Sequence, residues 1–289
     1  MYYYIIASLS IVLWGILPTV VKFSINDLNV SSFLVLRFFV STVLLIWVLP
    51  SLLKKRAKLN KNFLLLFLAI VAVLFVSQTL ALRFLSVTTY IVAFTLTPLL
   101  TLLILRYKLS RKACLGVFLA VTGSLVFFYR SGNVSLFHIN YIAIFLMFLG
   151  MISWVFYTLV ISKLHKNFND FEIVALTNYL ALFSSIIFWF LNGLPVDKIP
   201  NEIMLASLLS GGLIPLAFIF FSIGLRHVAS FTITIQYLEP IFGLIFAYLF
   251  LHETLDKLQI VGSIMVIIGI GFISRYSQSH NLDKLKEQQ

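Results

Sequence analysis

Ten apolar segments follow one another along this 289-residue chain, joined by short polar connections. A membrane-spanning helix needs about 20 mostly apolar residues, and each segment approaches or exceeds that length. The chain is 61% hydrophobic and 11% charged, whereas soluble domains are about 45–50% apolar and about 25% charged. The sequence therefore predicts an all-α integral membrane protein with ten transmembrane helices. The predicted spans are Tyr2–Phe23, Ser31–Leu53, Phe63–Leu85, Thr88–Leu105, Ala113–Tyr129, Ile139–Ser162, Phe171–Leu191, Ile203–Leu225, Ala229–Leu251 and Leu258–Ser274.

The two halves of the chain resemble each other in register. The matched pairs are Trp14 with Trp154, Ala81 with Gly224, Pro98 with Pro240, Gly116 with Gly262, and Gly123 with Gly269. Five spans in each half is an odd number, so the second half must insert in the opposite orientation. Such inverted repeats are common in secondary transporters. We expect one repeat over residues 1–132, a second over 133–278, and a polar cytoplasmic tail over 279–289.

The formal net charge is +11, which in a soluble protein would suggest a nucleic-acid partner. Here, however, Lys and Arg concentrate in the even-numbered connections and in the tail, as expected for cytoplasmic segments. The charge therefore predicts topology rather than nucleic-acid binding. We expect a multi-pass protein of the cell (inner) membrane, with both termini cytoplasmic, surrounded by lipid and present as a monomer or homodimer.

One acid, Glu239, lies deep inside a predicted span, whereas the other acidic residues fall in connections, at helix ends or in the tail. A charge at the centre of a span costs about 2.5–3.5 kcal/mol on insertion scales, and intramembrane carboxylates are commonly functional. Helical spacing places Thr232 and Gln236 on the same face as Glu239. The equivalent positions of the first half carry Tyr90 and Thr97. We expect these polar faces to meet near the membrane midplane.

Two interpretations of Glu239 remain open. In the functional one, its carboxylate binds an amine or cationic group of a substrate, or carries a coupling proton. In the structural one, it is bonded to neighbouring helix ends or paired with Arg37. Pro240 follows directly, and a proline inside a helix frees a backbone carbonyl one turn earlier, which can line a wet cavity.

Several other residues inside the spans are candidates for the substrate site. Arg37 either binds a substrate carboxylate, or snorkels to the surface or pairs structurally. Trp14, Trp154 and Tyr157 form either a cavity wall or ordinary packing and interface anchors. Asn178 is a weaker cavity candidate, because such amides commonly join helices by hydrogen bonds.

Four stretches of the sequence carry a resemblance to a known family. They are LWGILPTVVKF from Leu13, ALRFLSVTTYIVAFTLTPLLT from Ala81, LEPIFGLIFAYLFLHETL from Leu238 and GSIMVIIGIGFI from Gly262. The chain resembles the EamA-type transporters of the drug/metabolite transporter superfamily. The resemblance implies ten helices, an inverted repeat, and export or uptake of small metabolites. Family members usually carry a Gly-Glu pair in each half. Here the second half has His252-Glu253 and the first half has no such pair.

The expected function is secondary-active transport of a small metabolite, such as an amino acid or related compound, by alternating access. Export is the expected direction, and proton coupling is one option for the energy source. Uptake of a nucleotide-like metabolite, drug efflux, and a non-transporting membrane partner protein are the alternatives. The sequence has no Gly-rich Lys-Ser/Thr phosphate loop and no clustered acids or histidines typical of a catalytic or metal site, so we predict neither an enzyme nor a cofactor.

Overall fold

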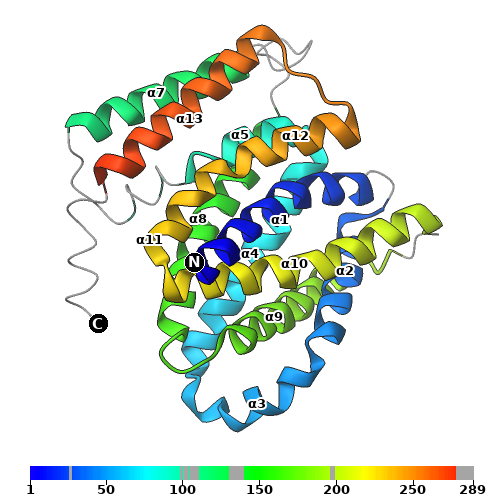
Figure 1. The fold of residues 1–289 in the computed structure, drawn as a ribbon. Helices are drawn as coiled ribbons and strands as arrows, with labels where there is room; N and C mark the ends of the chain where they lie inside the picture. The colour runs from blue at the N-terminus through cyan, green and yellow to red at the C-terminus, as the bar shows by residue number, and fades with distance from the viewer. Residues whose placement is uncertain are drawn as a thin grey trace.

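The computed structural model describes residues 1–25, 28–97, 100, 104, 111–129, 140–195 and 199–277. In this part of the chain the regular secondary structure is helical (Figure 1). The first half contains α1 (Tyr2–Ile25), α2 (Val30–Leu44), η1 (Ile46–Val48), α3 (Leu49–Lys54), η2 (Arg56–Lys58), α4 (Lys61–Phe84), α5 (Val87–Phe94) and α7 (Arg111–Tyr129). The second contains α8 (Tyr141–Leu164), α9 (Asp170–Leu191), α10 (Asn201–His227), α11 (Ala229–Ile235), η4 (Gln236–Leu238), α12 (Glu239–Leu251) and α13 (Lys257–Ser277).

Five of the described helices, α1, α4, α8, α9 and α10, are long and apolar enough to cross a membrane. The bent pair of α2 with the segment Ile46–Lys54 makes a sixth if it is counted as one span. Three shorter apolar helices occupy Cys114–Phe127, Glu239–Leu251 and Lys257–Gly269. The all-helical, apolar architecture is therefore confirmed, and the number of ten spans stays a prediction. Most of the fourth predicted span after Thr97, including Pro98, and the tail from residue 279 lie outside the described residues.

Two spans predicted as continuous helices are broken in the structure. In the predicted span Ser31–Leu53, the axis turns by 54° at Leu45. The ninth predicted span divides into α11, the short 3₁₀ segment η4 and α12. Pro50 and Pro240 lie in the first turns of α3 and α12. Proline fits a first turn, where its missing N–H needs no partner, but its ring clashes with a preceding helical turn.

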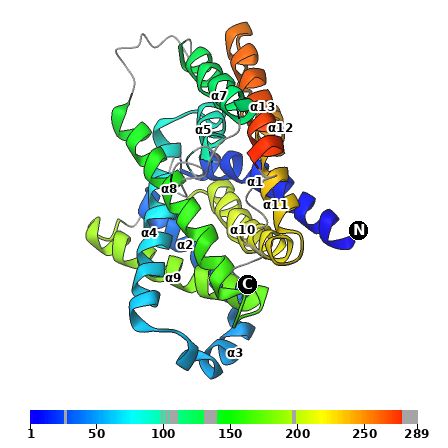
Figure 2. The same ribbon diagram turned by 90° about the vertical axis from the view of Figure 1, so that its left-hand side faces the viewer.

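The helices of the two halves pack in matching pairs. The contact of α1 with α10 has its counterpart in that of α8 with α4, and the contact of α2 with α10 in that of α9 with α4. The pairs α2 with α9, α5 with α12, and α7 with α13 each join equivalent helices. Figures 1 and 2 both show α7 and α13 side by side at one end of the molecule. Exchanging the halves thus reproduces the main packing contacts.

Glycines allow α7 and α13 to approach closely. A Cβ atom added to Gly123 would lie 2.7 Å from the carbonyl oxygen of Gly262, and one added to Gly269 would lie 2.6 Å from that of Gly116. Small residues of this kind let helix backbones come into contact in membranes. The matched glycine pairs of the sequence therefore form one helix–helix contact.

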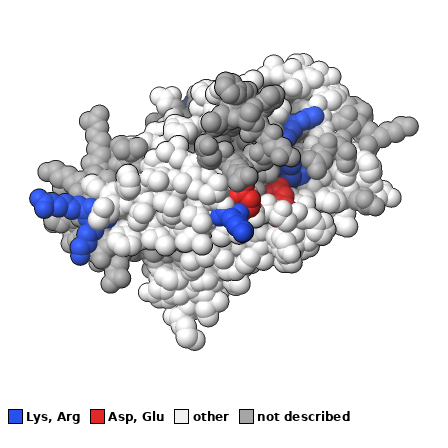
Figure 3. All heavy atoms as spheres, turned by 90° about the horizontal axis from the view of Figure 1, so that it is seen from above, with Lys and Arg blue, Asp and Glu red and all other residues white. Residues whose placement is uncertain are grey.

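The surface is mostly uncharged, as Figure 3 shows for the face seen from above. Large apolar side chains point outward on several helices, for example Leu125, Phe145 and Phe190, which are 66%, 63% and 68% exposed. A soluble protein rarely exposes apolar surface this extensively. These faces suit contact with lipid.

Ionic side chains hold the helix ends together. Glu253 accepts hydrogen bonds from the backbone amides of Val87 and Thr88, at 2.9 and 2.8 Å, at the start of α5. The ammonium group of Lys22 donates to the carbonyl oxygens of Leu82 and Arg83, at 2.8 and 3.3 Å, at the end of α4. Glu253 thus binds the start of α5 and Lys22 binds the end of α4, on the two sides of the break between these helices.

Candidate functional site

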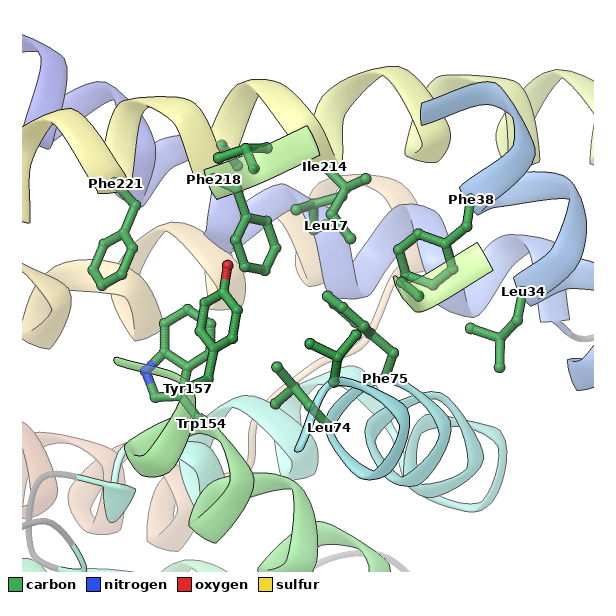
Figure 4. Packing of buried hydrophobic residues seen from close by; sticks show 14 of the residues in the cluster. Leu17, Leu34, Phe38, Leu74, Phe75, Trp154, Tyr157, Ile214, Phe218 and Phe221 are labelled. Carbon is green, nitrogen blue, oxygen red and sulfur yellow. The ribbon is translucent and has the colours of Figure 1, made fainter. Parts of the chain in front are cut away.

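An aromatic cluster fills the region where the two halves meet. The indole rings of Trp14 on α1 and Trp154 on α8 are 4.9 Å apart between centroids, at 76°. Phe218 of α10 lies 4.7 Å from Trp14, and Tyr157 lies 5.6 Å from Trp154. Figure 4 shows Phe218 and Phe221 of α10 pointing toward Trp154 and Tyr157. Three of the aromatic residues predicted for the site therefore lie together.

Tyr90 links this aromatic cluster to the charged residues Glu239 and Arg37. Its ring stacks on Phe94 with centroids 5.8 Å apart, and Phe94 lies 6.4 Å from Trp154. Tyr90 is 5% exposed and interacts electrostatically with both Glu239 and Arg37. One buried tyrosine is thus within electrostatic reach of both a carboxyl group and a guanidinium group.

Glu239 is the first residue of α12, directly after the 3₁₀ segment η4. The positive end of the helix dipole favours an acidic side chain in a first turn, which offsets part of the cost of placing Glu239 within a span. The residue as a whole is partly exposed. No ion pair of 4 Å or less joins the described side chains of Glu239 and Arg37. The direct pair considered from the sequence is therefore not formed.

Arg37 lies in the middle of α2 and is 6% exposed. Its guanidinium carbon lies 5.8 Å from the ring centroid of Phe33 and 5.5 Å from that of Phe38. Its Nε atom is buried and has no hydrogen-bond partner in the part of the chain that the structure describes. Snorkelling, the second interpretation from the sequence, would leave the charged end exposed, and the structure does not show this.

The remaining predicted site residues lie in different surroundings. Gln236 belongs to η4 and is partly exposed, one turn before Glu239. Thr232 is fully buried, its hydroxyl donates to the carbonyl of Val228, and it packs against Gly224 of α10. These contacts place Thr232 at a helix interface.

Three further candidates are buried and bonded within the protein. The Thr97 hydroxyl donates to the carbonyl of Phe94. The Tyr157 hydroxyl lies 3.2 Å from that of Thr177. The Asn178 amide nitrogen donates to the carbonyl of Val174 at 2.8 Å, while its Oδ1 has no partner. Asn178 is therefore the one of these three with a free polar atom.

Sequence reasoning missed two residues of the cluster. Phe218 and Phe221 carry no charge or polar group and stand among many other apolar residues. The spacing of Phe218 and Phe221, three residues apart, places them on one helix face and was the available signal. Glu253 was placed at the end of the ninth span, without its bonds to α5.

The apolar helices and the enclosed polar and aromatic residues define a multi-pass membrane protein. The family model described as the EamA-like transporter family matches residues 1–129 and 141–275. The chain therefore belongs to the EamA-like transporter family, a family of membrane transporters of small molecules within the drug/metabolite transporter superfamily. The resemblance seen in the sequence is confirmed.

Two other comparisons complete this result. The crystal structure of another protein matches with a TM-score of 0.66 and 14% identity, over 95% of this chain and 98% of the other. At that identity the likeness shows the fold alone. No curated protein matches the chain.

Proposed function

We propose that this chain is a secondary-active transporter that exports a small amphipathic metabolite, such as an amino acid, by alternating access. The observation that carries the proposal is the position of Glu239. It is a partly exposed acid at a helix break, electrostatically coupled to Tyr90, which connects through Phe94 to the aromatic cluster where the halves meet.

The architecture supports movement of the halves against each other. We propose ten spans arranged as two inverted five-helix repeats, because exchanging the halves reproduces the packing contacts. In transporters of this type, the site lies near the midplane beside discontinuous helices, and the repeats rock around it. The division of the ninth predicted span into α11, η4 and α12 supplies such a discontinuity.

The chemistry of the site fits a metabolite with an amine and an apolar body. Glu239 would bind the ammonium group or exchange it for a proton, Gln236 would add a polar contact, and Trp14 and Trp154 would enclose the apolar part. Proton exchange would couple transport to the gradient across the inner membrane. The predicted cytoplasmic location of both termini follows from the distribution of Lys and Arg.

Flux in reconstituted vesicles tests the proposal. The purified protein is placed in vesicles with an imposed pH gradient, and the movement of labelled amino acids, nucleosides and cationic drugs is measured beside protein-free vesicles. Gradient-dependent movement of amino acids supports metabolite transport, and movement of the drugs or nucleosides alone favours the alternative substrates. No flux of any compound, with stable co-purification of one protein, favours the non-transporting partner.

A further inference from the structure

Arg37 is a charged side chain that is buried without an ionic partner among the described residues. It lies about 10 Å along α2 from the start of that helix, from seven residues at a rise of about 1.5 Å each. Taking a cation out of water is costly unless it is paired and hydrogen-bonded. The two nearby rings of Phe33 and Phe38, at 5.8 and 5.5 Å, supply only the weaker attraction of an aromatic face.

A bond that would normally satisfy a buried guanidinium is missing among the described residues. The buried Nε has no hydrogen-bond partner there, and the described acids that form ion pairs, Asp170 and Glu172, pair with other basic residues. Unpaired buried atoms also occur, within the described residues, on the two helices that contact α2 most extensively, at Asn178 Oδ1 on α9 and Ser207 Oγ on α10. Buried polar groups of native proteins normally have a hydrogen-bond partner, which ordered water or a bound ligand can supply.

The backbone around Arg37 is fixed. Its carbonyl oxygen accepts a hydrogen bond from Ser41 Oγ, which also lies 2.6 Å from the carbonyl oxygen of Gly211. A Cβ atom added to Gly211 would lie 2.7 Å from the Arg37 carbonyl oxygen. Helix α2 is therefore in close contact with α10 at this point. The backbone that carries the Arg37 guanidinium is held in place by that contact.

We infer that Arg37 is an anion subsite that binds the carboxylate of the transported metabolite. The inference rests on the proposed function, and it specifies the substrate class as a zwitterion. Tyr90 interacts electrostatically with both Arg37 and Glu239, so a group of each charge lies within reach of one phenol. A guanidinium binds a carboxylate through two parallel hydrogen bonds, which a lysine ammonium does not reproduce.

The test compares each amino acid with its amide. Labelled leucine and phenylalanine are measured beside leucinamide and phenylalaninamide, which keep the amine and the side chain but lose the negative charge. We expect wild-type vesicles to move the acids at least about tenfold faster than the amides, because one lost charged contact is worth that factor or more. In Arg37→Met this preference should disappear, and Arg37→Lys should restore only part of it.

A matched variant and a second readout keep the test decisive. Arg83→Met removes an arginine whose side chain is exposed near the end of α4, and it should keep the preference. If Arg37→Met fails to fold, binding to the wild type is followed by its intrinsic tryptophan fluorescence, to which Trp14 and Trp154 contribute, with the acid expected to bind about tenfold more tightly than the amide. Equal treatment of acid and amide by the wild type, or an unchanged preference in Arg37→Met, would overturn the subsite and leave the transporter function standing. Binding and flux of neither compound would overturn both.

Discussion

Trp14 and Trp154 meet edge to face, with ring centroids 4.9 Å apart, although 140 positions separate them in the sequence. They come from equivalent helices of the two halves, α1 and α8. Their contact therefore lies at the interface between the halves, where relative movement of the repeats would alter it. Phe218 and Phe221 of α10 complete the packing around the pair.

Replacing Trp154 tests whether this contact matters for transport. Trp154→Ala should lower flux at least about tenfold and lower stability by about 3–5 kcal/mol, the usual cost of truncating a buried aromatic residue. Trp154→Phe should keep most of both. Flux and the thermal unfolding midpoint in detergent are the measurements. Trp47→Phe, at a 62% exposed position on η1, is the control, and equal losses in it would contradict a specific role for Trp154.

The glycine contact between α7 and α13 predicts that substitutions at two positions of α13 will differ strongly in their effect on stability. Gly269→Leu should lower the unfolding midpoint, because overpacking costs about 1–3 kcal/mol or more and the added side chain would meet the α7 backbone. Gly271→Leu should have little effect, since a Cβ atom added there meets nothing within 4 Å. Equal midpoints for the two variants would show that the two helices do not pack as described.

The two hydrogen bonds of Glu253 predict a local effect at the start of α5. Glu253→Gln keeps the shape but loses the charge and one of the two acceptor oxygens, at a cost of about 2 kcal/mol. The backbone amides of Val87 and Thr88 should then exchange with deuterium about tenfold or more faster. Asp256→Asn is a suitable control, because Asp256 accepts from the Gln259 amide at 2.8 Å and asparagine also caps helices well. Unchanged protection at Val87 and Thr88 would remove this role from Glu253.

Long apolar helices were predictable from the sequence. The predicted span Tyr2–Phe23 ends two residues before α1 does, and the predicted span Phe171–Leu191 begins one residue after the start of α9; their other ends agree. A run of membrane length is a strong signal, because few other structures tolerate it. The matched glycines also indicated that the fifth and tenth spans occupy equivalent places in the two halves. In the structure these glycines lie in the contact between α7 and α13.

The breaks and the long-range bonds were not predictable in the same way. Pro50 signals a helix start, but the bend lies five residues earlier, at Leu45. The partner of Glu253 is more than 160 positions away, so no local pattern names it. The aromatic cluster escaped detection because spans that are apolar on all sides do not show which face is buried.

Transport by Glu239→Gln, beside the wild type, tests the central claim most directly. Both proteins are placed in vesicles, labelled leucine and phenylalanine are supplied under a pH gradient, and Asp256→Asn serves as the control that removes an acid outside the spans. The account predicts gradient-dependent flux by the wild type and the control, and a loss of at least about tenfold in Glu239→Gln with an unchanged unfolding midpoint. Equal flux by Glu239→Gln and the wild type would contradict it and leave Glu239 as a structural residue at the start of α12.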